Sequence, residues 1–148
     1  MKKLLGLVFL MLILVSATEI TSSKLQTENS LEGTWELVNR FNYDGVNVTD
    51  TILNTNGYRQ VKIYSKGKVM WTRYSPDDPS EWFGYGIYKI DDNTLQERLE
   101  YGSAEMMKVI DTTVVFEFEL ELDKDTYKQI TLDEEGNKTF SENYKRID

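Results

Sequence analysis

The stretch TVVFEFELEL, residues 113–122, alternates apolar and acidic side chains more regularly than any other part of the chain. One set of alternate positions is apolar and the other is acidic: Val114, Phe116, Phe118, Leu120 and Leu122 against Glu117, Glu119 and Glu121. A period of two is the geometry of a β-strand with one half-buried face. We therefore expect a strand here, and we interpret the three glutamates as a solvated surface rather than a site.

Similar strand-like runs lie on both sides of this stretch. They cover residues 33–41, 58–64, 68–74, 81–90, 94–101, 105–110, 126–132 and 138–147, and short turn-forming segments separate most of them. Residues 42–57 are expected to form a long polar connection. Alanine occurs only at Ala17 and Ala104, and β-branched and aromatic residues are plentiful, so the sequence predicts no helix.

Consecutive hairpins of this kind form a meander, and a meander that closes on itself leaves no bare edge strand. The fold expected for residues 32–148 is therefore all-β, a single antiparallel up-and-down β-barrel of 8–10 strands. The interior of such a barrel holds either packed side chains or one small ligand. Residues 18–31 are polar and irregular, and we expect a flexible lead-in there.

Residues 1–17 resemble a secretory signal peptide. Lys2 and Lys3 precede the apolar run of residues 4–15, and small residues follow at Ser16 and Ala17. The run is shorter than the roughly 20 residues that span a bilayer. We expect cleavage after Ala17, export to the periplasm or the medium, and no stable membrane insertion of the mature chain.

Composition excludes several classes of function. The formal charge of −8 disfavours nucleic acid as a partner, because its phosphates are also negative. The chain contains neither cysteine nor histidine. It therefore has no Ser-His-Asp triad, no thiolate nucleophile and no zinc site of the usual kind. No catalytic residue, metal ligand or cofactor is predicted, and the sequence does not identify a protein partner.

Both ends of the expected barrel resemble the calycin superfamily, which includes the lipocalins and fatty-acid-binding proteins. Gly33-Thr34-Trp35 begins the first strand, and Tyr144-Lys145-Arg146 ends the last. In that superfamily a Gly-x-Trp lies at the closed end of the barrel, and an arginine from the last strand lies across the indole. The resemblance implies that Gly33, Trp35 and Arg146 are structural and do not touch a ligand.

The middle of the chain also resembles uncharacterised lipocalin-like proteins exported by Gram-negative bacteria. The matching stretches are Gly84-Tyr85-Gly86-Ile87-Tyr88, Leu95-Gln96-Glu97-Arg98-Leu99-Glu100-Tyr101 and Glu142-Asn143-Tyr144-Lys145-Arg146. Arg98 stands where that group is expected to have histidine, and the usual lipocalin disulfide is absent. The resemblance implies the fold more strongly than it implies a function.

Aromatic residues in two consecutive strands suggest a lined cavity. We expect its walls and polar anchors among a set of seven ligand-binding candidates: Trp71, Arg73, Tyr85, Glu97, Arg98, Tyr101 and Phe116. Gly84 and Gly86 would leave room for a ligand to approach the strand. The alternative is that the aromatic side chains simply fill the core and the two glycines relieve barrel curvature.

Three functions remain open at this point. The first is an exported protein that holds a small amphipathic ligand in the barrel, where an inward Arg73 would favour an acidic head group. The second is an interaction module of the cell envelope with a filled barrel, for which Trp82 and Phe83 would form an outer apolar patch. The third is an enzyme that uses a buried Glu97 as acid or base beside Tyr101 or Arg98.

Overall fold

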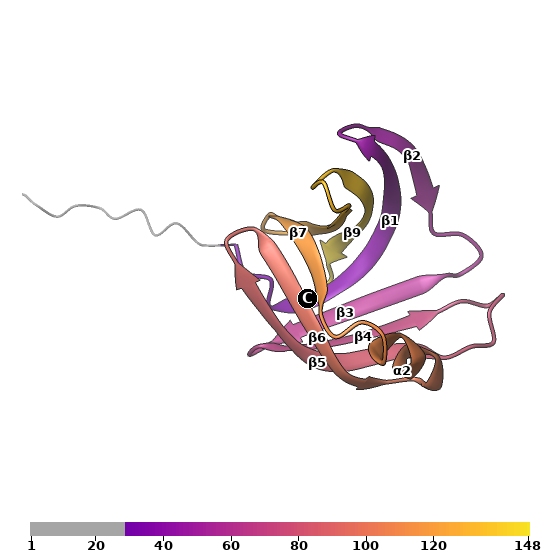
Figure 1. The fold of residues 1–148 in the computed structure, drawn as a ribbon. Helices are drawn as coiled ribbons and strands as arrows, with labels where there is room; N and C mark the ends of the chain where they lie inside the picture. The colour runs from indigo at the N-terminus through magenta and orange to yellow at the C-terminus, as the bar shows by residue number, and fades with distance from the viewer. Residues whose placement is uncertain (1–28) are drawn as a thin grey trace, which may run out of the picture.

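A computed structural model describes residues 29–148 of the chain. This part forms nine strands and one short helix. Figure 1 shows how they are arranged in space. The strands are β1 (Gly33–Gly45), β2 (Val48–Leu53), β3 (Arg59–Ser65), β4 (Lys68–Tyr74), β5 (Trp82–Asp91), β6 (Thr94–Gly102), β7 (Phe116–Leu122), β8 (Thr126–Leu132) and β9 (Lys138–Arg146), and the helix is α2 (Ala104–Ile110). Within residues 29–148 no helix is long and apolar enough to cross a membrane.

The strands form one antiparallel sheet that closes on itself. Their order is β2-β1-β3-β4-β5-β6-β7-β8-β9, and β1 also pairs with β9 along most of its length. The pairing of the first strand with the last makes a ring of all strands except β2, which pairs only with the distal half of β1. The prediction of an all-β, antiparallel, closed barrel is confirmed.

Two predicted segments differ from the structure. Residues 105–110 form helix α2 rather than a strand, because the Ser103 side chain accepts a hydrogen bond from the Met106 N–H and caps the first turn.

Residues 42–57 are not a simple connection, since β1 continues to Gly45 and the chain returns as β2. The Asp44 carboxylate accepts from the Val46 and Asn47 N–H groups and builds that turn. Every residue of β2 is exposed, so β2 has no buried face to produce an apolar alternation.

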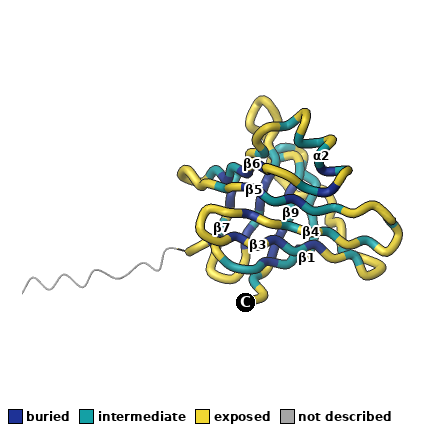
Figure 2. Tube along the Cα trace, turned by 90° about the horizontal axis from the view of Figure 1, so that it is seen from below, coloured by how far each residue is buried: buried dark blue, intermediate teal, exposed yellow. Residues whose placement is uncertain are grey.

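The closed end of the barrel is packed around Trp35, which is fully buried. The Arg146 guanidinium lies 4.1 Å from the centre of the Trp35 ring, and the indole N–H donates to the Leu31 carbonyl at 2.8 Å. A side chain at Gly33 would overlap the Arg146 guanidinium. This is the arrangement that the calycin resemblance implies. Figure 2 shows the buried positions on the strands that enclose the interior.

The predicted signal peptide and most of the predicted lead-in lie outside the described residues. The described end of the lead-in is residues 29–31. Leu31 is buried in the core at the closed end.

Two of the β-bulges in the sheet bear on which face the side chains occupy. In β1, Leu37 pairs with Tyr144 of β9 and Asn39 pairs with Asn143, so Val38 between them has no partner and forms a bulge. In β6, Leu99 pairs with Gly86 of β5 and Tyr101 pairs with Tyr85, so Glu100 between them has no partner and forms a second bulge. A bulge interrupts the strict alternation of a strand, so residues beyond it face the opposite way from the extrapolated pattern.

Candidate functional site

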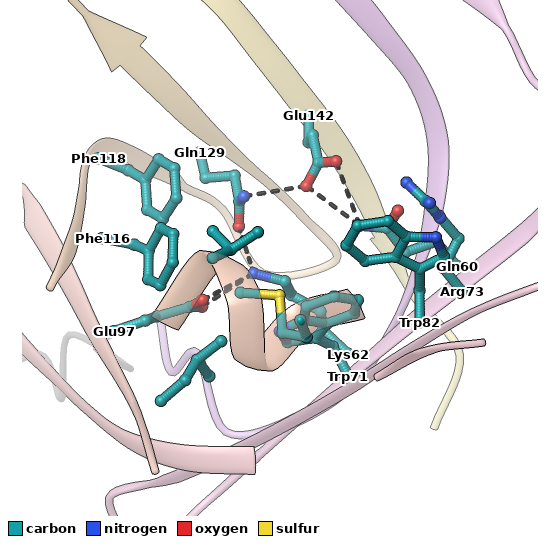
Figure 3. Close-up of a pocket in the computed structure, with 13 residues that line it drawn as sticks. Gln60, Lys62, Trp71, Arg73, Trp82, Glu97, Phe116, Phe118, Gln129 and Glu142 are labelled. Atoms are coloured by element: carbon teal, nitrogen blue, oxygen red, sulfur yellow. Dashed lines mark hydrogen bonds and ion pairs between the residues drawn. The ribbon is translucent and has the colours of Figure 1, made fainter. Parts of the chain in front are cut away.

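A cavity of about 240 Å³ lies in the barrel, away from the closed end that is packed around Trp35. Figure 3 shows the residues that line it. Strands β3 to β9 and helix α2 all contribute to its wall. Its apolar lining residues are Trp71, Trp82, Leu99, Met106, Val109, Phe116 and Phe118. Its polar lining residues are Gln60, Lys62, Arg73, Glu97, Gln129 and Glu142. The barrel is therefore not completely filled by its own side chains.

The apolar wall depends on a glycine and on the helix. A Cβ at Gly84 would lie 2.8 Å from the Trp71 indole nitrogen, so the glycine gives Trp71 room against β5. Helix α2 follows β6 directly and places Met106 and Val109 over the interior. Trp71 and the helix thus both contribute apolar surface to the same cavity.

A buried ion pair forms the middle of the polar lining. The Lys62 ammonium donates to both Glu97 carboxylate oxygens at 2.9 and 3.0 Å and to the Gln129 side-chain oxygen at 2.8 Å. The Lys62 and Glu97 side chains are each only 4% exposed. Tyr64 also donates its hydroxyl to Glu97. Each charge has several partners, which is the condition under which a buried ion pair is tolerated.

Glu142 is the second carboxylate of the cavity, and hydrogen-bond donors surround it. Gln60 donates to both oxygens at 3.2 Å, Gln129 donates at 2.9 Å and the Tyr144 hydroxyl at 2.6 Å. Arg40 lies 3.8 Å from the same carboxylate. The acceptor capacity of Glu142 is therefore largely used within the protein.

Three buried tyrosines connect the cavity to the core. Burial raises the pKa of Tyr64, Tyr127 and Tyr144 well above the ordinary value, because the charged phenolate would lose its hydration. The carboxylate of Glu97 raises the pKa of Tyr64 further, and that of Glu142 does the same for Tyr144. These hydroxyls are therefore neutral donors at physiological pH.

Arg73 and Trp82 form a pair at one side of the cavity. They are cross-strand partners on β4 and β5, and the guanidinium carbon lies 4.4 Å from the centre of the indole. Arg73 Nε and Trp82 Nε1 are inaccessible to solvent and make no hydrogen bond of standard geometry within residues 29–148. Hydrogen bonds from Ser80 and, more weakly, from the Trp82 indole lower the pKa of the neighbouring Asp78. Buried donors without partners are rare in folded proteins, so these two distinguish this corner from the rest of the lining.

Four of the seven predicted ligand-binding residues line the cavity together. Trp71 and Arg73 reach it from β4, Glu97 from β6 and Phe116 from β7. Their side chains alternate with more exposed neighbours, as the strand periodicity predicts.

The expectation that Tyr85, Arg98 and Tyr101 line the cavity is wrong. Arg98 lies between the buried residues Glu97 and Leu99, and its side chain is exposed on the outer face of β6. Simple alternation would turn Tyr101 inwards, but the bulge at Glu100 reverses it, and Tyr101 is 53% exposed. Tyr85 packs beside Tyr101 with ring centres 5.3 Å apart.

Two further expectations are corrected by the same geometry. Glu97 has Lys62 and Tyr64 as neighbours, not Tyr101 or Arg98, so the partners expected for an acid–base role are on the other side of the sheet. Trp82 and Phe83 are both half-buried, and Trp82 lines the cavity, so these two do not form an exposed outer patch.

Sequence reasoning missed the polar half of the cavity. Gln60, Lys62 and Tyr64 occupy the buried positions of β3, and Gln129 and Glu142 face them from β8 and β9. The pattern Gln-x-Lys-x-Tyr in β3 was the available signal, because it places polar residues on one face opposite Val61 and Ile63. That signal does not reveal which of the two faces is buried.

Comparisons with known proteins support an assignment of the fold. No protein-family model matches the chain, and no curated protein matches it. Among solved structures, a lipocalin-like protein from Bacteroides uniformis ATCC 8492 superimposes with a TM-score of 0.54, at 16% identity over 79% of this chain and 98% of that one. The fold is lipocalin-like. An uncharacterized protein from Bacteroides eggerthii DSM 20697 gives a TM-score of 0.52, at 16% identity over 80% of this chain and 100% of that one.

Proposed function

We propose that this lipocalin-like protein is exported and holds a small amphipathic molecule in the barrel cavity. The observation that carries the proposal is the division of the cavity lining into an apolar and a polar part. Phe116, Phe118 and Trp71 contribute apolar surface, whereas Arg73 and Glu142 contribute polar groups. Binding sites for small molecules combine apolar walls with a few polar groups in this way.

The size of the cavity limits the ligand. At about 240 Å³ it lies just below the range of about 300–1,000 Å³ that is usual for drug-sized ligands. A medium-length aliphatic chain with one polar group fits this description better than a sterol or a long-chain lipid. We therefore expect octanoate and decanoate to bind more tightly than bile acids.

Native mass spectrometry of the purified protein tests the proposal. We expect either a co-purified small molecule or stoichiometric binding from a panel of fatty acids of graded length and bile acids. Val109→Trp should abolish binding, because Val109 lines the cavity from α2 and the larger ring would occupy it. Val46→Trp is the matched control, since Val46 is 78% exposed at the β1–β2 turn.

Two results would remove the proposal. One is repeated recovery of an empty protein that binds no member of the panel. The other is equal binding by the Val109→Trp and Val46→Trp variants, because the ligand would then lie outside the cavity.

Export is the second part of the proposal, and it rests on the Lys2-Lys3 pair, the apolar run of residues 4–15 and the small residues before Thr18. Expression in a Gram-negative host should release the protein into the periplasm with Thr18 as its first residue. Intact-mass measurement of the periplasmic fraction checks this. A cytoplasmic protein that retains residues 1–17 would contradict it.

A further inference from the structure

A pair of tyrosines lies on the outer face of the sheet, on the other side from the cavity. Tyr85 on β5 and Tyr101 on β6 are cross-strand partners, and their ring centres are 5.3 Å apart with an angle of 34° between the ring planes. The bulge at Glu100 turns Tyr101 outwards and so brings the two rings together. Bulges are over-represented where a strand re-aims one side chain at a functional site.

The two tyrosines belong to an apolar row that crosses four strands. Met70 on β4 lies opposite Tyr85, and Ile63 on β3 lies opposite Met70. Ile63, Met70 and Tyr101 are 44%, 48% and 53% exposed. Strands β3 to β6 are consecutive in one wall of the barrel (Figure 1), so the row extends over about 14 Å. Single exposed apolar residues are ordinary, whereas a contiguous row indicates a binding surface.

Hydrogen-bonding groups of both kinds border this row. The Lys68 ammonium lies 5.9 Å from the centre of the Tyr85 ring and 3.6 Å from the Glu100 carboxylate. The Lys68 and Glu100 side chains are 48% and 47% exposed, so solvent weakens their ion pair. The hydroxyls of Tyr85 and Tyr101 are also free, because the tyrosine hydroxyls with hydrogen bonds inside the described part of the chain are those of Tyr43, Tyr58, Tyr64, Tyr127 and Tyr144.

These features together define the chemistry of a ligand. A polyanion would meet the Glu100 carboxylate and the net charge of −8. A purely aliphatic ligand would cover the charged groups and the tyrosine hydroxyls without giving them hydrogen bonds. A neutral sugar ring avoids both costs, because its C–H face stacks on an aromatic ring while its hydroxyls both donate and accept.

We propose that the outer row of Met70, Tyr85 and Tyr101 binds a neutral oligosaccharide of the cellulose or chitin type. Its sugar rings stack on the two tyrosines, and its hydroxyls make hydrogen bonds with Lys68 and Glu100. Chains of this type are flat, extended ribbons, which match a straight row on an open sheet face. The site does not depend on the cavity, because alternate residues of a strand point to opposite faces.

Isothermal titration calorimetry with cellohexaose and chitohexaose tests the inference. The wild-type protein should bind at least one of them with a dissociation constant below about 1 mM. Tyr101→Ala should weaken this binding by about tenfold, whereas Tyr101→Phe should stay within about threefold of wild type, because it keeps the ring. Tyr74→Ala is the matched control and should bind as the wild type does. Tyr74 is 64% exposed on the same face of β4, but it lies opposite Arg59 and outside the row.

A charged chain tests the neutral character of the ligand. Hexamannuronate is a similarly linked chain with a carboxylate on each ring, and it should bind at least about threefold more weakly than the neutral chain. Glu100→Gln should reduce this difference. Thermal melts of each variant, followed by circular dichroism, verify that it is folded before titration.

Four results would overturn the inference. The first is the absence of binding by both neutral chains, and the second is an equal effect of Tyr101→Ala and Tyr74→Ala. The third is binding of hexamannuronate as tight as that of the neutral chain. The fourth is a dimer in sedimentation velocity that Tyr101→Ala dissociates, because the row would then be a contact between two copies of the chain. None of these results bears on the ligand of the cavity.

Discussion

At the residue scale, the cavity is organised by a buried charge pair that spans the barrel. Lys62 on β3 reaches Glu97 on β6 and Gln129 on β8, so one side chain connects three strands that are not neighbours in the sheet. The pair costs desolvation energy, which its hydrogen bonds offset. Its consequence is a fixed polar surface beside the apolar wall.

Removing one member of this pair should destabilise the protein strongly. Lys62→Met leaves the Glu97 carboxylate buried without its cation, and we expect the free energy of unfolding to fall by about 3–5 kcal/mol. Urea denaturation measures this change. Lys128→Met is the matched control, since Lys128 pairs with Glu121 at 2.8 Å on the surface, and its loss should cost less than about 1 kcal/mol.

The double variant Lys62→Met/Glu97→Gln should recover part of the loss, because no uncompensated charge remains in the interior. Equal effects of Lys62→Met and Lys128→Met would show that the buried pair contributes no more than a surface pair.

At the element scale, helix α2 closes the interior between β6 and β7. Those two strands pair only from Thr94 to Glu97 on β6, and beyond that point the chain turns into the helix. Met106 and Val109 from this helix cover the apolar end of the cavity. The helix has only seven residues, so it depends on its cap and on packing rather than on intrinsic propensity.

The cap of α2 should therefore influence both stability and ligand affinity. Ser103→Ala removes the side chain that accepts from the Met106 N–H, and we expect a loss of about 1 kcal/mol in the free energy of unfolding. Octanoate affinity should fall as well, because Met106 and Val109 lose their fixed positions. Ser65→Ala, at an exposed position at the end of β3, should change neither quantity by more than about 0.5 kcal/mol. A Ser103→Ala variant indistinguishable from Ser65→Ala would contradict the role of the cap.

The strands and the helix also show which structural features can be predicted from the sequence and which cannot. Strands with one buried face, such as β7, are evident from their alternation. Strand β2 is exposed throughout, and α2 is a single short helix after a serine cap, so neither has a periodic signal. The bulge at Glu100 has no sequence signature either, and it accounts for the wrong placement of Tyr101. Arg73 and Glu97 could be predicted to line the cavity because the alternation of their strands is uninterrupted up to those residues.

At the scale of the whole molecule, closure of β1 on β9 creates a barrel with two unlike ends. Trp35, Tyr127 and Tyr144 pack at the closed end, where the two tyrosine rings stack with centres 4.6 Å apart. The cavity occupies the opposite end. The closed end was predictable because Gly33, Trp35 and Arg146 resemble calycin motifs, whereas the cavity lining depends on side chains from seven strands and a helix.

The buried tyrosines make global stability sensitive to high pH. The folded-state pKa of Tyr64, Tyr127 and Tyr144 is raised above the ordinary value of 10.0, so the folded state retains protons that the unfolded state releases. Their contribution to the free energy of unfolding should be constant below about pH 10 and should be lost as the pH rises further. Tyrosinate absorbance and circular dichroism, recorded together, should show these three of the nine tyrosines ionising only as the sheet unfolds. Ionisation of all nine with an unchanged sheet signal would be inconsistent with their burial.

The most direct test of the ligand cavity is a methyl NMR titration of methionine-labelled protein with octanoate. Met106 is 5% exposed and lines the cavity, whereas Met70 is 48% exposed on the outer face of β4. Binding inside the barrel should shift the Met106 methyl resonance in a saturable way and leave that of Met70 in place. A Met106 resonance that stays fixed, or equal shifts at both methionines, would mean that the barrel interior does not take up the ligand.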